Sequence, residues 1–144
     1  LAGRRDQPNS ATSPINICME PFFLLWLLIK HILVDLAIQR STPPHIQKLK
    51  RFYCKWPWGH LHYINHCIGT FLVTWYFVNF FTAVIIAAID YIVHWHIDYS
   101  KYRILVKFKI DNVPESYIRY WWIQTFDQIL HYITYYILVM LATF

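Results

Sequence analysis

A stretch of the sequence from Tyr63 to Ile89 contains no charged residue, counting histidine as neutral, and a second uncharged stretch follows Asp127. Apolar runs of about 18 residues or more are typical of transmembrane helices. A helix on the surface of a soluble bundle needs a polar stripe, which the segment IGTFLVTWYFVNFFTAVIIAAI does not supply. These stretches therefore favour insertion into a lipid bilayer.

The composition argues against a water-soluble globule. Hydrophobic residues make up 57% of the chain and charged residues 15%, whereas typical soluble domains carry about 25% charged residues. Cys18, Cys54 and Cys67 form no CxxC pair, so we expect neither disulfides nor a thiolate metal site. The net charge of +5 does not indicate nucleic acid binding, because the basic residues lie in two short loops beside apolar segments.

We predict an all-α fold, a four-helix transmembrane bundle, in residues 19–144. Residues 1–18 are polar, and we interpret them as a disordered leader or as sequence upstream of a start at Met19. The helices are expected at about 21–40, 60–78, 81–100 and 120–144, each near the length that spans a bilayer core. The VNFF join contains no glycine or proline, so the second and third helices could also be one long kinked helix.

The loops predict the orientation in the membrane. Their basic residues are Arg40, Lys48, Lys50, Arg51 and Lys55 in the first long loop, and Lys101, Arg103, Lys107, Lys109 and Arg119 in the second. Because basic loops stay in the cytoplasm, we expect a multi-pass protein of the cell inner membrane with both termini outside the cytoplasm. The WPWG and YWW segments are typical of an interfacial aromatic belt, and their basic neighbours could contact anionic lipid headgroups.

Each predicted helix nevertheless carries two ionisable residues four positions apart, a spacing that places both on one helix face. The pairs are His31 and Asp35, His62 and His66, His94 and Asp98, and Asp127 and His131. In the predicted orientation, all eight side chains lie at a similar depth, near the cytoplasmic side. Because an unpaired charge inside a membrane costs a few kcal/mol or more, we expect the eight side chains to face one another.

Histidine nitrogen and carboxylate oxygen together suit a divalent transition metal, namely zinc, manganese or non-haem iron. Eight candidates exceed the ligands of one ion, so either two ions bind or some carboxylates orient histidines. A metal-bound water has its pKa lowered towards about 7 and would supply a nucleophile for hydrolysis. The alternatives are polar contacts that only hold the helices together, a proton relay, and bis-histidine haem, which would not need the carboxylates.

Four further polar residues of the predicted helices have separate interpretations: Lys30, His60, Asp90 and His96. Lys30 lies deep in the first helix, where we expect a salt bridge within the bundle. Asp90 is one turn deeper than the pairs, and it either orients a ligand or bonds to Asn79 or Thr82. His60 competes with His62 as a ligand, whereas His96 lies on another face and is expected to pack or to face lipid.

The motifs HILVDLAIQ, HYINH, HWHIDYSK and DQILH occur in this order along the chain. They resemble the motifs of small bacterial and phage membrane proteins that form the family named domain of unknown function 3307. The resemblance covers about residues 24–140 and adds Gln39, Tyr99, Lys101 and Gln128 to the paired residues. It implies an integral membrane protein of phage or prophage origin, without a settled activity.

The function we expect is metal-dependent hydrolysis of a lipid-like or membrane-proximal substrate at the His/Asp site. Similarity to membrane-bound metal-dependent hydrolases extends only to the His/Asp pattern. The competing hypothesis is a non-enzymatic phage membrane accessory or partner-binding protein, whose polar residues have a purely structural role. The sequence indicates no serine or cysteine nucleophile, because Cys67 points away from the His66 face and Ser100 has no evident base.

Overall fold

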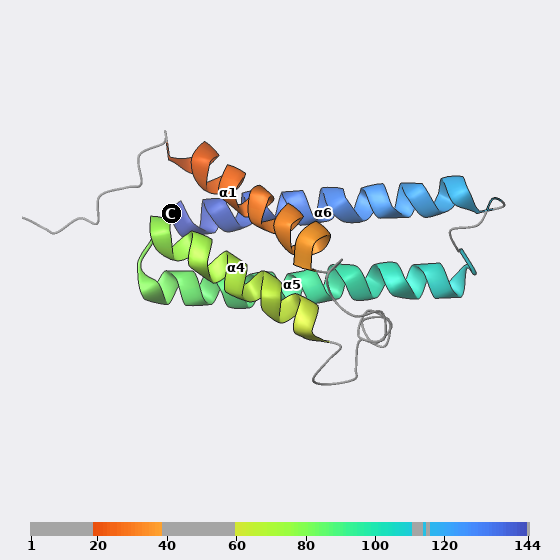
Figure 1. Cartoon of the computed structure of the whole chain (residues 1–144), viewed down its shortest axis with the longest axis horizontal. Helices are drawn as coiled ribbons and strands as arrows, with labels where there is room; N and C mark the ends of the chain where they lie inside the picture. The colour runs from red at the N-terminus through yellow and green to blue at the C-terminus, as the bar shows by residue number, and fades with distance from the viewer. Residues whose placement is uncertain (1–18, 39–59, 111–113, 115, 144) are drawn as a thin grey trace, which may run out of the picture.

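The computed structural model describes residues 19–38, 60–110, 114 and 116–143, and these residues form four helices that pack side by side (Figure 1). The first, α1, comprises Glu20–Ile32 and continues as a π-helical segment, η1, over Leu33–Ile38. The others are α4 (Leu61–Phe77), α5 (Phe80–Lys107) and α6 (Tyr117–Thr143). The predicted all-α fold with four helices is therefore confirmed. Residues 1–18, WPWG, and the basic residues at 40–55 lie outside the described residues.

The boundary between α4 and α5 is sharp, so the alternative of one long kinked helix is wrong. Val78 has an extended conformation, and the Asn79 side chain accepts a hydrogen bond of 3.0 Å from the Thr82 amide. Asparagine is favoured at this position because its side-chain oxygen satisfies an amide that the first helical turn leaves without a partner. The chain therefore reverses here, and α5 runs back antiparallel to α4 (Figure 1).

Two helix boundaries differ from the sequence prediction. Helix α5 ends at Lys107, not near Ser100, because no glycine or proline interrupts the intervening residues. Helix α6 begins at Tyr117, one turn before the predicted start. At 1.5 Å per residue, α5 is about 42 Å long, and its C-terminal part extends with the first turns of α6 beyond α1 and α4 (Figure 1). We call residues 102–107 and 117–125 the two-helix extension.

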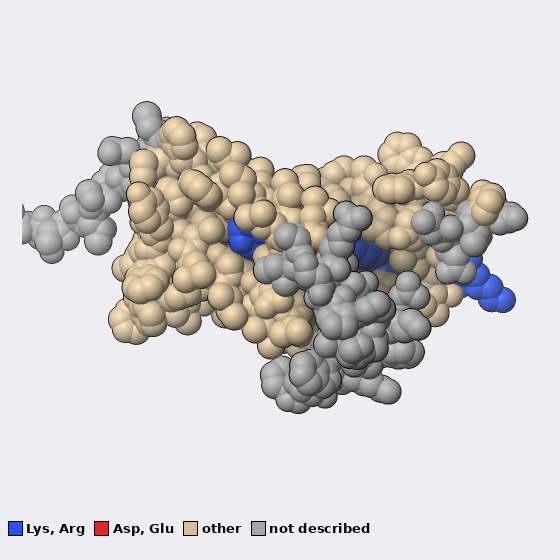
Figure 2. Space-filling view, viewed as in Figure 1, with Lys and Arg blue, Asp and Glu red and all other residues tan. Residues whose placement is uncertain are grey.

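Large apolar side chains dominate the outside of the bundle. Phe22, Tyr76, Phe81 and Trp122 are among the many that are exposed. Figure 2 shows a face on which Lys, Arg, Asp and Glu occupy only small areas. The interior, by contrast, contains many polar side chains: Lys30, His31, His66, Thr70, Thr74, Asp90, His94, Asp98, Ser116, Asp127 and His131 are all buried. Such a distribution reverses that of ordinary soluble proteins, in which charged residues are almost never fully buried unless paired.

The apolar core lies at the end of the bundle where α1 begins and α6 ends. It consists of Phe23, Leu27, Ile86, Tyr135, Leu138 and Val139. Phe23 also stacks on Phe77, with ring centroids 4.7 Å apart, so the last turn of α4 is packed against the first turn of α1. This apolar layer closes one end of the bundle, and the polar side chains follow it along the helices.

Among the described helices, α5 alone is long and apolar enough to cross a membrane, judged by length and composition. Helices α1 and α4 have 13 and 17 residues, and α6 is long enough but less apolar. The multi-pass arrangement and its orientation therefore stay predictions.

Candidate metal centre

The polar interior follows the four-residue spacing of the helices. The interior polar residues are His62, His66, Thr70 and Thr74 on α4, Asp90, His94 and Asp98 on α5, and Asp127, His131 and Tyr135 on α6. Because residues at i and i+4 lie on the same helix face, each of these helices presents one continuous polar stripe to the interior. The first helix contributes Lys30, His31 and Asp35 to the same region.

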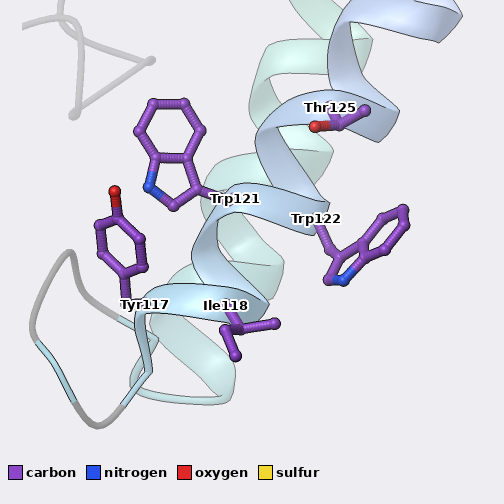
Figure 3. A pocket seen from close by; sticks show the side chains of 5 residues that line it. All are labelled: Tyr117, Ile118, Trp121, Trp122 and Thr125. Atoms are coloured by element: carbon purple, nitrogen blue, oxygen red, sulfur yellow. The ribbon is translucent and has the colours of Figure 1, made fainter.

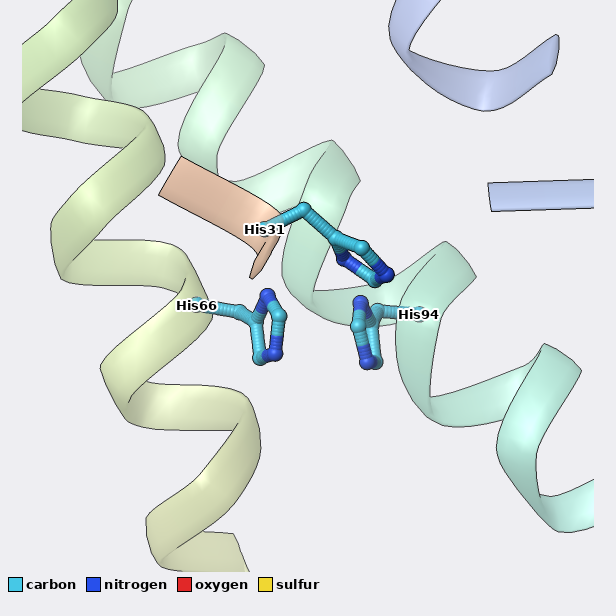
Figure 4. A group of neighbouring side chains, drawn as sticks. All are labelled: His31, His66 and His94. Atoms are coloured by element: carbon cyan, nitrogen blue, oxygen red, sulfur yellow. The ribbon is translucent and has the colours of Figure 1, made fainter. Parts of the chain in front are cut away.

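Three histidines from α1, α4 and α5 form the centre of the cluster, where their rings converge (Figure 4). The ring centroids are 4.0 Å apart for His66 and His94, 5.1 Å for His31 and His66, and 5.7 Å for His31 and His94. One nitrogen from each ring lies within 4.8 Å of one nitrogen from each of the others. The His131 ring extends this stack, with its centroid 4.1 Å from that of His94.

Asp35 lies beside this group, in the π-helical segment η1. Its carboxylate oxygens are 3.1 Å from His66 Nε2, 3.3 Å from His31 Nε2 and 3.5 Å from His62 Nε2. Asp35, His62 and His66 form a second group with metal-ligand spacing. At 26% exposure, Asp35 is the most accessible member of the cluster. A π-helical turn widens the helix and is frequent at functional sites, and this one brings the carboxylate to three histidines.

The opposite part of the cluster contains more carboxylates. Asp98, Asp127 and His131 form a third group, in which His131 Nε2 is 3.7 Å from both Asp98 Oδ1 and Asp127 Oδ1. The other Asp98 oxygen, Oδ2, is 3.9 Å from His62 Nε2 and 3.9 Å from His94 Nε2. Asp98 therefore joins the carboxylate-rich part of the cluster to the histidine-rich part.

The structure thus brings together all eight residues that the sequence singled out as candidate ligands. Each belongs to at least one group with metal-ligand spacing, and within the described ranges no other His, Cys, Asp or Glu does. That these residues bind a metal ion stays a prediction.

A buried lysine network, which the sequence indicated only in part, lies next to the histidines. Lys30 Nζ is 3.2 Å from Asp90 Oδ2 and donates to the Tyr135 hydroxyl at 3.0 Å. The Thr70 hydroxyl donates to the same Asp90 oxygen, and Lys30 Nζ is also 3.5 Å from the His66 carbonyl oxygen. The salt bridge expected for Lys30 is therefore confirmed.

The partners suggested for Asp90 are wrong. Asn79 and Thr82 bond to each other at the start of α5, whereas Asp90 lies more than two turns further along and faces α1 and α4. Asp90 also belongs to none of the groups with metal-ligand spacing found in the described residues. Its role in the described structure is to pair with Lys30.

Tyr135 and Gln128 orient His31. The Tyr135 hydroxyl is 3.0 Å from His31 Nδ1, and Gln128 Oε1 is 3.2 Å from His31 Nε2. A hydrogen bond at the ring nitrogen that does not bind the metal orients a ligating imidazole. Tyr135 is placed for this role at Nδ1, whereas the contact of Gln128 would give way to an ion bound at Nε2. Tyr135 is absent from the sequence prediction, although it continues the spacing of Asp127 and His131 by another four residues.

Two histidines of the described residues, His60 and His96, lie outside the cluster and have other contacts. His60 Nδ1 is 2.7 Å from the Tyr91 hydroxyl, so His62 joins the cluster in its place. His96 is exposed and its Nδ1 is 2.7 Å from the Ile92 carbonyl oxygen, which confirms that it lies on another face from His94. Gln39 lies outside the described residues.

The fold and the cluster together define the class of protein: a four-helix protein with a buried His/Asp centre to which every helix contributes. The model of a family described as protein of unknown function (DUF3307) matches residues 23–144, and the chain belongs to this family. The resemblance based on the four ordered motifs is thus confirmed. No curated protein and no solved structure matches the chain. The function is therefore argued from the site itself.

Proposed function

We propose that this protein is a multi-pass integral membrane protein whose His/Asp cluster binds a divalent transition metal ion and uses it to hydrolyse a lipid-like or membrane-proximal substrate. The observation that carries the proposal is that carboxyl groups outnumber amino groups in and around the cluster. The charged groups of the cluster and its lysine network are the carboxylates of Asp35, Asp90, Asp98 and Asp127 and the ammonium groups of Lys30 and Lys101.

With ionised carboxylates and neutral histidines, the four carboxylates and two ammonium groups give this part of the interior a net charge of −2. An uncompensated charge in a low-dielectric interior costs several kcal/mol. One divalent cation would balance both charges. Neutral imidazole is also the form of histidine that binds metal ions.

The donor atoms support a transition metal. Imidazole nitrogen with carboxylate oxygen suits zinc, manganese or iron, and a metal ion held there would supply an activated water for hydrolysis. We propose that the ion binds among His31, His66 and His94 (Figure 4). Asp35 lies beside two of these histidines, His31 and His66. A substrate would approach on the side of Asp35, the most exposed of the candidate ligands.

The membrane part of the proposal is supported by the exposed apolar surface and by the two-helix extension. At the start of α6, Tyr117, Ile118, Trp121, Trp122 and Thr125 line a pocket, and the two indole rings project away from the helix (Figure 3). Exposed Trp and Tyr side chains are typical of the membrane–water interface. The exposed basic residues Arg103, Lys107 and Arg119 lie on the same extension, which we therefore place at the cytoplasmic headgroups.

The topology is tested with reporter fusions at the two termini. We expect both fusions to report a location outside the cytoplasm. A cytoplasmic signal from either terminus would refute the proposed orientation.

The metal is tested by elemental mass spectrometry on detergent-purified protein. We expect about one equivalent of a transition metal in the parent protein and none in a His66→Ala/His94→Ala variant that keeps its helical circular dichroism. His96→Ala is the control, because His96 lies on the same helix as His94 but outside the cluster. Absence of metal from the parent protein under metal-replete conditions would refute the proposal.

Hydrolysis is tested with ester, phosphoester and amide substrates presented in mixed micelles. We expect turnover that a chelator abolishes, that added metal restores, and that the His66→Ala/His94→Ala variant lacks. Turnover that survives in this variant would exclude the cluster as its source.

A second candidate function is a non-enzymatic membrane accessory protein that binds a partner. Lys30 favours it, because this one side chain on α1 contacts α4, α5 and α6 through His66, Asp90 and Tyr135. In that case the polar residues hold the helices together. The histidine variants would then lose helical structure, and the parent protein would contain no metal.

A further inference from the structure

The carboxylate-rich part of the cluster already contains a cation of its own. Lys101 Nζ is 2.8 Å from Asp127 Oδ2 and 3.2 Å from Asp98 Oδ1. These are two of the three residues in the Asp98, Asp127 and His131 group, whose donor atoms lie within 4.8 Å of one another. The ammonium group therefore lies beside the position that a metal ion in this group would take.

We propose that Lys101 replaces a second metal ion at Asp98 and Asp127, so that the centre binds a single ion among its histidines. This inference rests on the proposed function, because it presupposes a metal ion at the histidine-rich part. It assigns Lys101 the role of a residue that sets the number of ions.

The geometry supports a second metal position at Asp98 and Asp127, which the Lys101 ammonium group occupies. Asp98 contacts both parts of the cluster, with Oδ1 near Lys101 and Oδ2 3.9 Å from the Nε2 atoms of His62 and His94. Helical bundles that bind two ions use carboxylates and histidines from facing helices, and Asp98 lies between the two parts of this cluster. In addition, Asp127 Oδ1 is buried and has no hydrogen-bond partner in the part of the chain that the structure describes. This second donor oxygen of the group is therefore available to a cation.

The balance of charge decides between one ion and two. With Lys101 in place, a single divalent ion compensates the two excess negative charges of the interior. With Lys101 displaced by a second ion, the four carboxylates would face one ammonium group and two divalent ions, which leaves one positive charge in excess. Excess charge of either sign is costly in a low-dielectric interior, so the single ion together with Lys101 is favoured.

Lys101 is also placed so that it can be removed without disrupting the apolar core. It is 17% exposed and lies where α5 emerges from the bundle, well separated in sequence from the core residue Ile86 of the same helix. Lys101→Met retains most of the apolar stem and removes only the charge. Without the Lys101 charge, one ion leaves one negative charge in excess and two ions leave one positive charge, so the charge balance no longer opposes a second ion. The carboxylate pair then lacks its cation, and we expect a second metal ion to bind there.

The experiment compares metal stoichiometry in four detergent-purified proteins at the same free Mn²⁺ concentration. We expect one ion per chain in the parent and two in Lys101→Met. Lys107→Met, an exposed lysine on the same helix, is the matched control and should keep one ion. The Lys101→Met/Asp127→Asn variant should return to one ion, because it removes a carboxylate together with the ammonium group.

Electron paramagnetic resonance gives an independent measurement on the same samples. The parent should show the spectrum of isolated Mn²⁺, and Lys101→Met the signal of two coupled ions. If Lys101→Met loses its helical circular dichroism, Lys101→Gln takes its place with the same expectations.

The outcomes separate this inference from the proposed function. If the parent and the Lys101 variant bind the same number of ions, one or two, the proposed role of Lys101 is refuted. The proposed metal centre is not refuted by this result. No ion in any of the proteins overturns both. An ion that binds only after Lys101 is replaced overturns the proposed function of the parent protein but supports the competition between Lys101 and metal.

Discussion

Gly69 lies in the middle of α4, and Gly69→Ala provides a strict test of the buried lysine network. An alanine in a helix interior ordinarily stabilises it by about 0.5–1 kcal/mol relative to glycine. At this position a Cβ atom would be 2.7 Å from Lys30 Cγ and 2.9 Å from Lys30 Cδ. The Lys30 stem therefore crosses α4 in space that the missing side chain of Gly69 provides.

Lys30 cannot move aside without cost, because its amino group is held by Asp90 and Tyr135. Breaking a buried ion pair by removing one partner costs about 3–5 kcal/mol. Subtracting a gain of about 1 kcal/mol in helix propensity, we expect Gly69→Ala to destabilise the protein by about 2–4 kcal/mol. The sign is opposite to the usual effect of this substitution.

The free energy of unfolding is measured in mixed micelles by adding denaturing detergent and recording circular dichroism. The parent, Gly69→Ala, Lys30→Ala and the double variant together form a double-mutant cycle. In a Lys30→Ala background the stem is absent, so we expect Gly69→Ala to stabilise by its ordinary propensity gain of about 0.5–1 kcal/mol. Stabilisation by Gly69→Ala in the parent protein, or the same effect in both backgrounds, would refute the proposed packing of Lys30 on Gly69.

Three further substitutions test other parts of the structure. Tyr135→Phe removes the hydroxyl that lies 3.0 Å from His31 Nδ1, and we expect metal affinity, measured by competition with a chelator, to fall about 10–100-fold while the helical signal persists. Asn79→Ala removes the cap on the Thr82 amide and should lower unfolding stability by about 1 kcal/mol, whereas Asn79→Gly should cost only a few tenths. His96→Ala should retain the metal content of the parent, since this ring bonds to the backbone of its own helix; a loss of metal would show that the cluster extends further than the geometry indicates.

The spacing of ionisable residues along the helices predicted much of the cluster. Residues four positions apart share a helix face whatever the tertiary fold, so pairs such as His94 and Asp98 were placed correctly from sequence alone. The same rule extends to Tyr135, which continues the stripe of Asp127 and His131, but a tyrosine in an aromatic-rich helix gives no signal of its own. Its contact with His31 depends on how α6 packs against α1.

Other features of the site could not be predicted because they depend on contacts between helices. Nothing in the spacing of Lys30 indicates Asp90 as its partner, since the two residues lie on helices that meet only in the folded bundle. The π-helical turn at Asp35 could not be predicted either, because the sequence of this segment is equally compatible with an α-helix. The extension of α5 past Ser100 was missed because basic residues suggested a loop, although they are compatible with an exposed helical turn.

The sequence by itself determined the four helices, the apolar character of their outer faces and the eight polar residues that one face of each helix presents. It could do so because helical periodicity and helix-breaking residues act locally, within a few positions of the chain. The tertiary structure alone decided how these faces meet: that Asp98 joins two groups of candidate ligands, that Lys30 pairs with Asp90, and that Lys101 lies between two carboxylates. Those relations depend on distances between side chains far apart in sequence, which are fixed only when the helices pack.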